Sequence, residues 1–118
     1  MSEENTLNKG IDENVISLET AQDWAERWRE QPGYNDTTVK AHLIPRVDIN
    51  ELLAEKYVVD IRAYIGIDDK GVNKLMLVGV DAAGNDLINA VMHQYIYDFT
   101  QPCPNTCDIN SPLYTLKP

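Results

Sequence analysis

The chain has 118 residues, of which 43% are hydrophobic and 25% are charged, and this is the composition of one folded globular domain. Nineteen acidic residues against ten basic residues give a formal net charge of -9. Nucleic acids and anionic membrane surfaces attract clustered Lys and Arg, yet no basic residue occurs between Lys74 and Lys117. The composition therefore predicts no nucleic-acid partner and no membrane partner.

The beginning of the sequence lacks the features of a targeting segment. Residues 1–14 are polar, charged and aperiodic, without the basic start and apolar run of a secretory signal. We therefore expect a flexible acidic tail over residues 1–14 and a cytoplasmic location. A single α+β domain is expected over residues 15–100, followed by an irregular segment rich in Pro and Cys over residues 101–118.

Two helices are predicted. The first begins after Ser17, a favourable N-cap, because apolar residues recur at helical spacing from Ala21 to Trp28. The second is short, over residues 49–55, because Asp48 followed by Glu51 resembles a capping box.

Four strands are predicted in chain order. Apolar residues alternate over residues 38–44 and 57–67, and the turn residues 68–71 lead to a returning strand over 74–80. A final strand, rich in aromatic residues, is expected over 91–99. The order predicts an α+β fold with a mostly antiparallel sheet of about four strands, one long helix on one face and one short helix.

The most characteristic stretches of the sequence are ISLETAQDW at 16–24, WRE at 28–30, AHLIP at 41–45, VDIRAYIGID at 59–68, KLMLVGVD at 74–81, and IYDFT at 96–100 followed by PCP at 102–104. Together they resemble a family of small uncharacterised bacterial proteins, and the similarity covers residues 16–113. The resemblance implies a bacterial source and a single domain. It implies no activity, cofactor or catalytic residue.

The two cysteines are the most visible candidate for chemistry. Cys103 and Cys107 are spaced one residue further apart than in the C-x-x-C redox motif, and prolines rather than basic residues surround them. We interpret the segment as a structural loop, with or without a bond between the two thiols. His42 and His93 bring the number of zinc-type ligands to four, but they lie singly on predicted strands far apart in the sequence. We predict no metal and no cofactor.

Two acidic turns resemble calcium-binding loops only superficially. Residues 68–73 and 81–86 both lack the D-x-[DN]-x-[DN]-G frame and its distant Glu. Asp, Asn and Gly are also the residues that hairpin turns select, so turn formation explains both segments.

The remaining candidate site lies on the predicted aromatic strand. His93, Tyr95, Tyr97 and Asp98 combine an imidazole, two phenols and a carboxylate, which can line a small-molecule pocket. Alternating aromatics also pack well against a helix, which is the alternative explanation. No nucleotide-binding or hydrolase motif occurs in the chain.

Two functions follow from these observations. The first is a non-enzymatic protein-binding or self-assembly module, because both parities of residues 74–80 are apolar and need cover on both faces. Its partner is another protein or a second copy of the chain. The alternative is a small-molecule-binding or enzymatic domain that uses the strand of His93, Tyr95, Tyr97 and Asp98. The predicted interface residues are Tyr64, Met76, Val78 and Val80.

Overall fold

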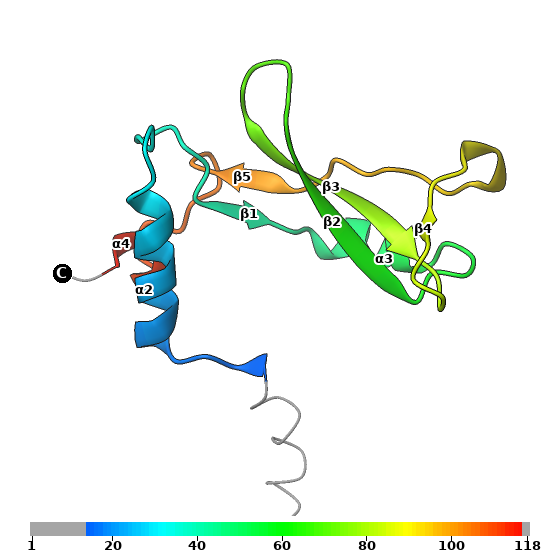
Figure 1. The fold of residues 1–118 in the computed structure, drawn as a ribbon, viewed down its shortest axis with the longest axis horizontal. Coiled ribbons are helices and arrows are strands. Elements are labelled where there is room, and N and C mark those ends of the chain that lie inside the picture. The colour runs from blue at the N-terminus through cyan, green and yellow to red at the C-terminus, as the bar shows by residue number, and fades with distance from the viewer. Residues whose placement is uncertain (1–13, 117–118) are drawn as a thin grey trace, which may run out of the picture. The chain divides into compact units, whose positions relative to one another are not determined.

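The computed structural model describes residues 14–116, which form two compact units (Figure 1). Within this range, unit 1 contains the residues up to Asn35 together with those from Asp108 onwards, and unit 2 is the continuous segment Asp36–Cys107. The acidic tail predicted over residues 1–14 lies, apart from Asn14, outside the described residues. Each unit is considered by itself below.

The described part of unit 1 contains the helices α2 (Leu18–Arg29) and α4 (Pro112–Thr115). The predicted N-cap of α2 is confirmed, because the Ser17 hydroxyl accepts a hydrogen bond from the Thr20 backbone N–H at 3.1 Å. Ser111 caps α4 in the same way. Both helices therefore begin at a serine whose side chain satisfies a backbone donor of the first turn.

Two side chains of α2 donate hydrogen bonds to backbone carbonyl groups of the C-terminal segment. The amide of Gln22 donates to the carbonyl oxygens of Pro112 and Leu116, both at 3.1 Å, and the Arg29 guanidinium donates to that of Leu113 at 3.0 Å. These bonds satisfy carbonyl groups that a helix of one turn leaves free. The packing of the long helix on the sheet concerns elements of two different units, and it stays a prediction.

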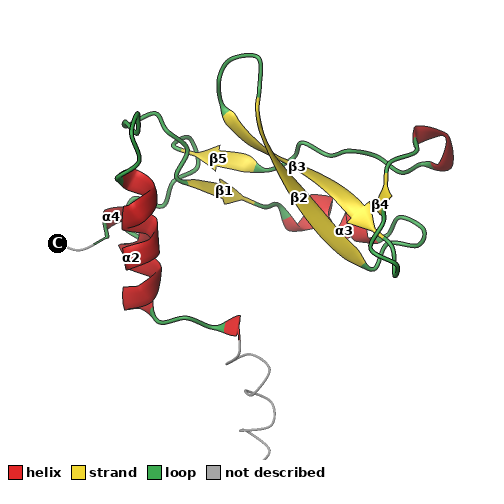
Figure 2. Cartoon of the chain, in the orientation of Figure 1, coloured by secondary structure: helices red, strands yellow, loops and turns green. Residues whose placement is uncertain are grey.

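The main sheet of unit 2 is an antiparallel meander of β2 (Asp60–Ile67), β3 (Asn73–Val80) and β4 (Asp86–Leu87), with β3 in the middle (Figure 2). Tyr64 lies opposite Met76, so the predicted hairpin forms with the predicted parity. With its helices and antiparallel sheets the structure confirms the α+β fold class.

A second, two-stranded antiparallel sheet pairs β1 (Ala41–Leu43) with β5 (Gln101–Cys103). The sheet predicted as one is thus divided in two, and part of the segment expected to be irregular is a strand. Pro102 lies opposite His42 in this sheet, where an edge strand tolerates the missing backbone N–H.

The short helix α3 (Arg46–Leu53) connects the two sheets and begins earlier than the capping-box pattern predicts. Its N-cap is Pro45, without a side-chain hydrogen bond, and Asp48 lies in the first turn. An acidic side chain there interacts favourably with the helix dipole. The pattern at Asp48 therefore marks the first turn of α3 rather than its cap.

The strand predicted over residues 91–99 is wrong. The register of β4 would bring Asn89 opposite Leu77, but that position is taken by Tyr97. The residues between leave the sheet as an insertion loop, residues 88–96, which reciprocal backbone hydrogen bonds between Asn89 and Gln94 close at 3.1 and 3.0 Å. A 3-10 turn, η1 (Ala90–Met92), forms its tip.

The core of unit 2 is centred on the second half of β3. Leu77 and Val78 point to opposite faces of the sheet and both are buried, as is Leu52 of α3. Side chains of both parities are therefore buried in this half of β3. The buried hydrophobic residues among those described are Val39, Leu52, Leu77, Val78, Val80 and Cys103.

Two strand glycines provide a test of this packing. A Cβ added at Gly79 would lie 2.4 Å from Cγ2 of Val58, a stiff β-branched side chain, whereas at Gly66 it would lie 2.8 Å from the terminal methyl of Met76, which can rotate away. We expect Gly79→Ala to lower the free energy of unfolding by about 1–3 kcal/mol and Gly66→Ala to lower it far less. Urea unfolding compares them, and equal losses would contradict this packing.

Candidate functional site

Four aromatic rings form a ladder that begins in the insertion loop. Successive ring centroids of His93, Tyr95, Tyr97 and Phe99 are 6.3, 6.3 and 5.6 Å apart, with edge-on or tilted geometry. The structure therefore brings together three of the four candidate ligand-binding residues, although they do not form a strand. The fourth, Asp98, forms an ion pair with Lys74, with 3.5 Å between the charged atoms.

The exposed end of the ladder is His93. Its backbone is left-handed, with φ of 60°, because the chain reverses there after η1. The ring atom Nδ1 lies 2.9 Å from the hydroxyl of Tyr95, so imidazole and phenol share a hydrogen bond at the surface. This pair is the candidate acid-base couple at the exposed end of the ladder.

The third ring of the ladder, Tyr97, has a partner that the sequence pattern does not reveal. The Tyr97 hydroxyl donates to Oε2 of Glu55, which lies just beyond α3. Burial, together with this carboxylate, raises the pKa of Tyr97 far above its usual value. The other carboxylate oxygen, Oε1 of Glu55, is buried and has no hydrogen-bond partner within the described range. Glu55 therefore depends on the Tyr97 hydroxyl.

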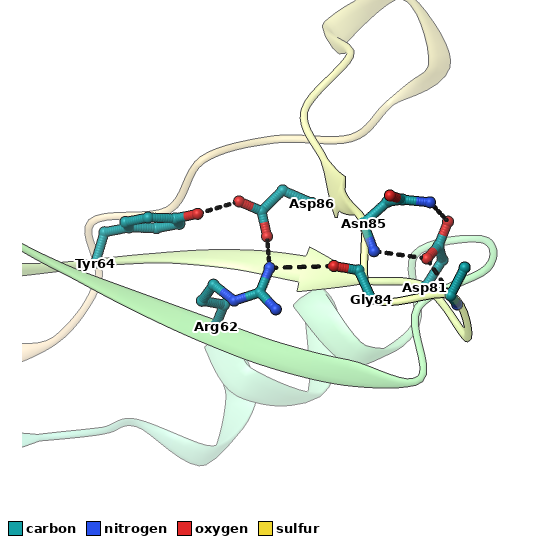
Figure 3. Close-up of polar contacts among 7 residues, drawn as sticks. Arg62, Tyr64, Asp81, Gly84, Asn85 and Asp86 are labelled. Carbon is teal, nitrogen blue, oxygen red and sulfur yellow. Dashed lines mark hydrogen bonds and ion pairs between the residues drawn. The ribbon is translucent and has the colours of Figure 1, made fainter.

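A second polar cluster lies on β2 and at the start of β4 (Figure 3). The carboxylate of Asp86 accepts hydrogen bonds from both Tyr64 and Arg62, and the guanidinium also reaches the carbonyl of Gly84 at 3.4 Å. The hydrogen bond from Tyr64 lowers the pKa of Asp86 and raises that of Tyr64. These hydrogen bonds connect the β3–β4 turn to β2. The polar groups of the cluster therefore have a structural role.

The two acidic turns have one construction. In each, the Asp side chain accepts backbone N–H groups from the residues two and four positions later, at 2.9 and 2.9 Å for Asp68 and at 3.0 and 2.8 Å for Asp81. Each turn ends at a glycine with positive φ, 83° at Gly71 and 87° at Gly84. The turn uses one carboxylate oxygen of Asp68 and both of Asp81, whose Oδ2 also accepts from the Asn85 side-chain amide at 3.3 Å, as the turn interpretation expects.

The four zinc-type side chains do not meet. Cys103 and Cys107 are joined in a disulfide with their Cα atoms 4.7 Å apart, and a bonded pair presents no thiolate to a metal. His42 Nδ1 lies 3.2 Å from the Thr100 hydroxyl, and burial, with Lys74, lowers its pKa. Among residues 14–116 no three side chains of His, Cys, Asp or Glu are placed to hold one metal ion.

The predicted interface residues divide into two kinds. Val78 and Val80 are buried core residues, so they do not contribute to the exposed patch predicted for them. Met76 is half-buried and Tyr64 is exposed. Exposed apolar side chains occur elsewhere, at Ile65 of β2 and in the insertion loop.

No protein-family model, no curated protein and no solved structure matches the chain. In the part that the structure describes, no helix is both long enough and apolar enough to cross a membrane. The resemblance to a bacterial family stays a prediction.

The Tyr97–Glu55 hydrogen bond is testable by removing one hydroxyl. Tyr97→Phe leaves the Glu55 carboxylate without its donor, and we expect a loss of about 1–3 kcal/mol in the free energy of unfolding. Tyr95→Phe removes an equivalent hydroxyl from the exposed part of the ladder and should cost much less. Similar losses from the two variants, measured by urea unfolding, would show that the buried contact is unimportant.

The acidic turns predict a pH dependence of stability. Backbone donors, chiefly the N–H of Val72 for Asp68 and that of Asn85 for Asp81, lower the folded-state pKa of both carboxyl groups. Their stabilising contribution is therefore complete above the unfolded pKa of about 3.9 and is lost as the pH falls through the lower folded value.

Unfolding followed from neutral to acidic pH measures this dependence. In Asp68→Asn, the free energy of unfolding should fall less steeply at acidic pH than in the wild-type protein. The matched change Asp69→Asn, at the next position of the same turn, should leave this pH dependence unchanged. Parallel profiles for the wild-type protein and Asp68→Asn would refute the assignment.

Proposed function

We propose that the chain is a non-enzymatic protein-binding module that works by self-assembly. The observation that carries the proposal is the exposure of large aliphatic side chains on unit 2, 84% for Ile65, 72% for Ile67 and 90% for Val91. A single exposed aliphatic residue is ordinary, but several of them on one unit offer apolar area that a protein partner could bury. Contact with another protein surface would remove them from water.

The insertion loop is built to present apolar side chains. The Asn89 side chain accepts from the Val91 N–H at 3.1 Å, its backbone is bonded to Gln94, and Gln94 itself is buried. A loop fixed in this way loses little conformational entropy when it binds. Its exposed apolar residues are Ile88, Val91, Met92, Tyr95 and Ile96.

The distribution of charge supports the same proposal. The chain has a formal net charge of -9, but residues 88–96 contain no Asp, Glu, Lys or Arg. Net charge keeps a protein soluble, while the central part of a protein interface is depleted of charged side chains. The loop has the composition of such an interface on an otherwise acidic molecule.

A small-molecule or enzymatic function of His93, Tyr95, Tyr97 and Asp98 remains the second proposal. It is favoured by the hydrogen bond between His93 and Tyr95 and by the carboxylate of Glu55 beside Tyr97, one oxygen of which is buried. Two of its members are engaged, Asp98 with Lys74 and Tyr97 with Glu55. An activity that His93→Ala abolishes without loss of folding would favour this proposal over assembly.

Light scattering behind size exclusion tests self-assembly. At tens of micromolar the full chain should have a mass well above 13.4 kDa, and the double variant Ile65→Asp/Val91→Asp should have the monomer mass. The control Val15→Asp/Ile109→Asp makes the same change in charge at exposed positions of unit 1 and should assemble like the wild-type protein. A monomeric wild-type chain, or equal assembly by both double variants, would overturn the proposal.

A further inference from the structure

The outer edge of β2 has unpaired backbone groups. β2 is the edge strand of the order β2-β3-β4, and at its end the Asp68 N–H donates to the carbonyl of Val72 at 2.9 Å. Hydrogen-bonded positions alternate along an antiparallel pair, so the even-numbered residues of β2 bond to β3 and the odd-numbered ones face outward. Within residues 14–116 no hydrogen bond reaches the outward backbone groups of Ile61, Ala63, Ile65 or Ile67.

Two of the usual protections of an edge strand are missing here. Residues 60–67 include no Pro and no Lys, two residues that commonly prevent edges from pairing. The opposite edge of the sheet is occupied by β4 and by the bridge from Leu77 to Tyr97. The β2 edge is therefore the place where this sheet can accept another strand.

We propose that two copies of the chain pair their β2 edges, antiparallel, about a two-fold axis at Ala63. This proposal rests on the proposed self-assembly and specifies its partner and register. Ala63 then faces Ala63 of the second copy. Ile61 of each copy faces Ile65 of the other copy. The two three-stranded sheets become one continuous sheet, and the apolar side chains on one face cover one another across the junction.

The other face of the strand selects this register. Arg62 of one copy then lies opposite Tyr64 of the other, so no like charges face each other, and Asp60 lies opposite Gly66, which has no side chain. A two-fold axis at Tyr64 instead would place Asp60 opposite Asp68 of the second copy, and two like charges directly opposite each other are destabilising. The side chains thus favour an axis at Ala63 over one at Tyr64.

The local charge favours a second copy over a basic partner. The strand contains one acid, Asp60, and one base, Arg62, so it is neutral although the whole chain has a net charge of -9. Two acidic copies repel at long range, and salt screens that repulsion. Added salt should therefore tighten self-pairing, whereas it would weaken binding to a basic protein.

Cysteine cross-linking tests which residues of the two β2 strands face each other. Facing residues of a hydrogen-bonded antiparallel pair have Cα atoms about 5.5 Å apart, which suits a disulfide, so Ala63→Cys should form a covalent dimer under mild oxidation. Ile61→Cys and Ile65→Cys should each fail alone, because two copies of the same residue would lie about 13 Å apart, but a mixture of the two should cross-link. Cross-linking by Tyr64→Cys in place of Ala63→Cys would overturn the register.

Light scattering on edge variants tests the pairing without a cross-link. The Ala63 N–H faces outward, so Ala63→Pro removes an intermolecular donor while the bonds to β3 remain, and it should weaken the dimer at least tenfold. Ala63→Val keeps the N–H and should remain dimeric. If Ala63→Pro does not fold, Ile65→Lys places a charge at the same edge on an exposed position.

The outcomes separate the two proposals. A folded Ala63→Pro or Ile65→Lys variant that stays fully dimeric overturns edge pairing. Self-assembly itself still stands in that case if Ile65→Asp/Val91→Asp is monomeric. A wild-type chain that is monomeric at every salt concentration overturns both.

Discussion

Unit 2 depends on the double pairing of β3. On one side β3 forms a complete antiparallel hairpin with β2, and on the other it bonds first to β4 and then, at Leu77, to Tyr97. Because the middle strand has partners on both edges and side chains on both faces, its second half is the most completely buried part of the described chain. α3, the insertion loop and the aromatic ladder all take their positions from this strand.

The features that local chemistry determines were predictable from the sequence. The hairpin follows from the alternation in residues 57–67 and the Asp-x-x-Gly turn, and the start of α2 follows from Ser17. The two acidic turns also follow, since one carboxylate and one left-handed glycine specify each of them. In these cases the residues that decide the structure are within a few positions of one another.

The features that were not predictable depend on distant residues. The alternation of residues 91–99 is that of a strand, but the edge of β3 that it would join is shared with β4, so the chain leaves as a loop and returns only at Tyr97. The contact of Tyr97 with Glu55 has no signal in the local sequence either. His93, Tyr95 and Tyr97 occupy alternate positions in the sequence. Their rings contact one another in the structure, although the segment is a loop rather than a strand.

The pairing of β1 with β5 has a consequence for the order in which the chain folds. Unit 2 is one continuous segment, whereas unit 1 is built from the segments before and after it. When Ala41 pairs with Cys103, the two ends of unit 2 come side by side, and the entropy cost of bringing α2 to α4 becomes that of a short loop rather than a long one. Loop-closure entropy therefore favours assembly of unit 1 after unit 2, once the residues of α4 are available to accept the hydrogen bonds of Gln22 and Arg29.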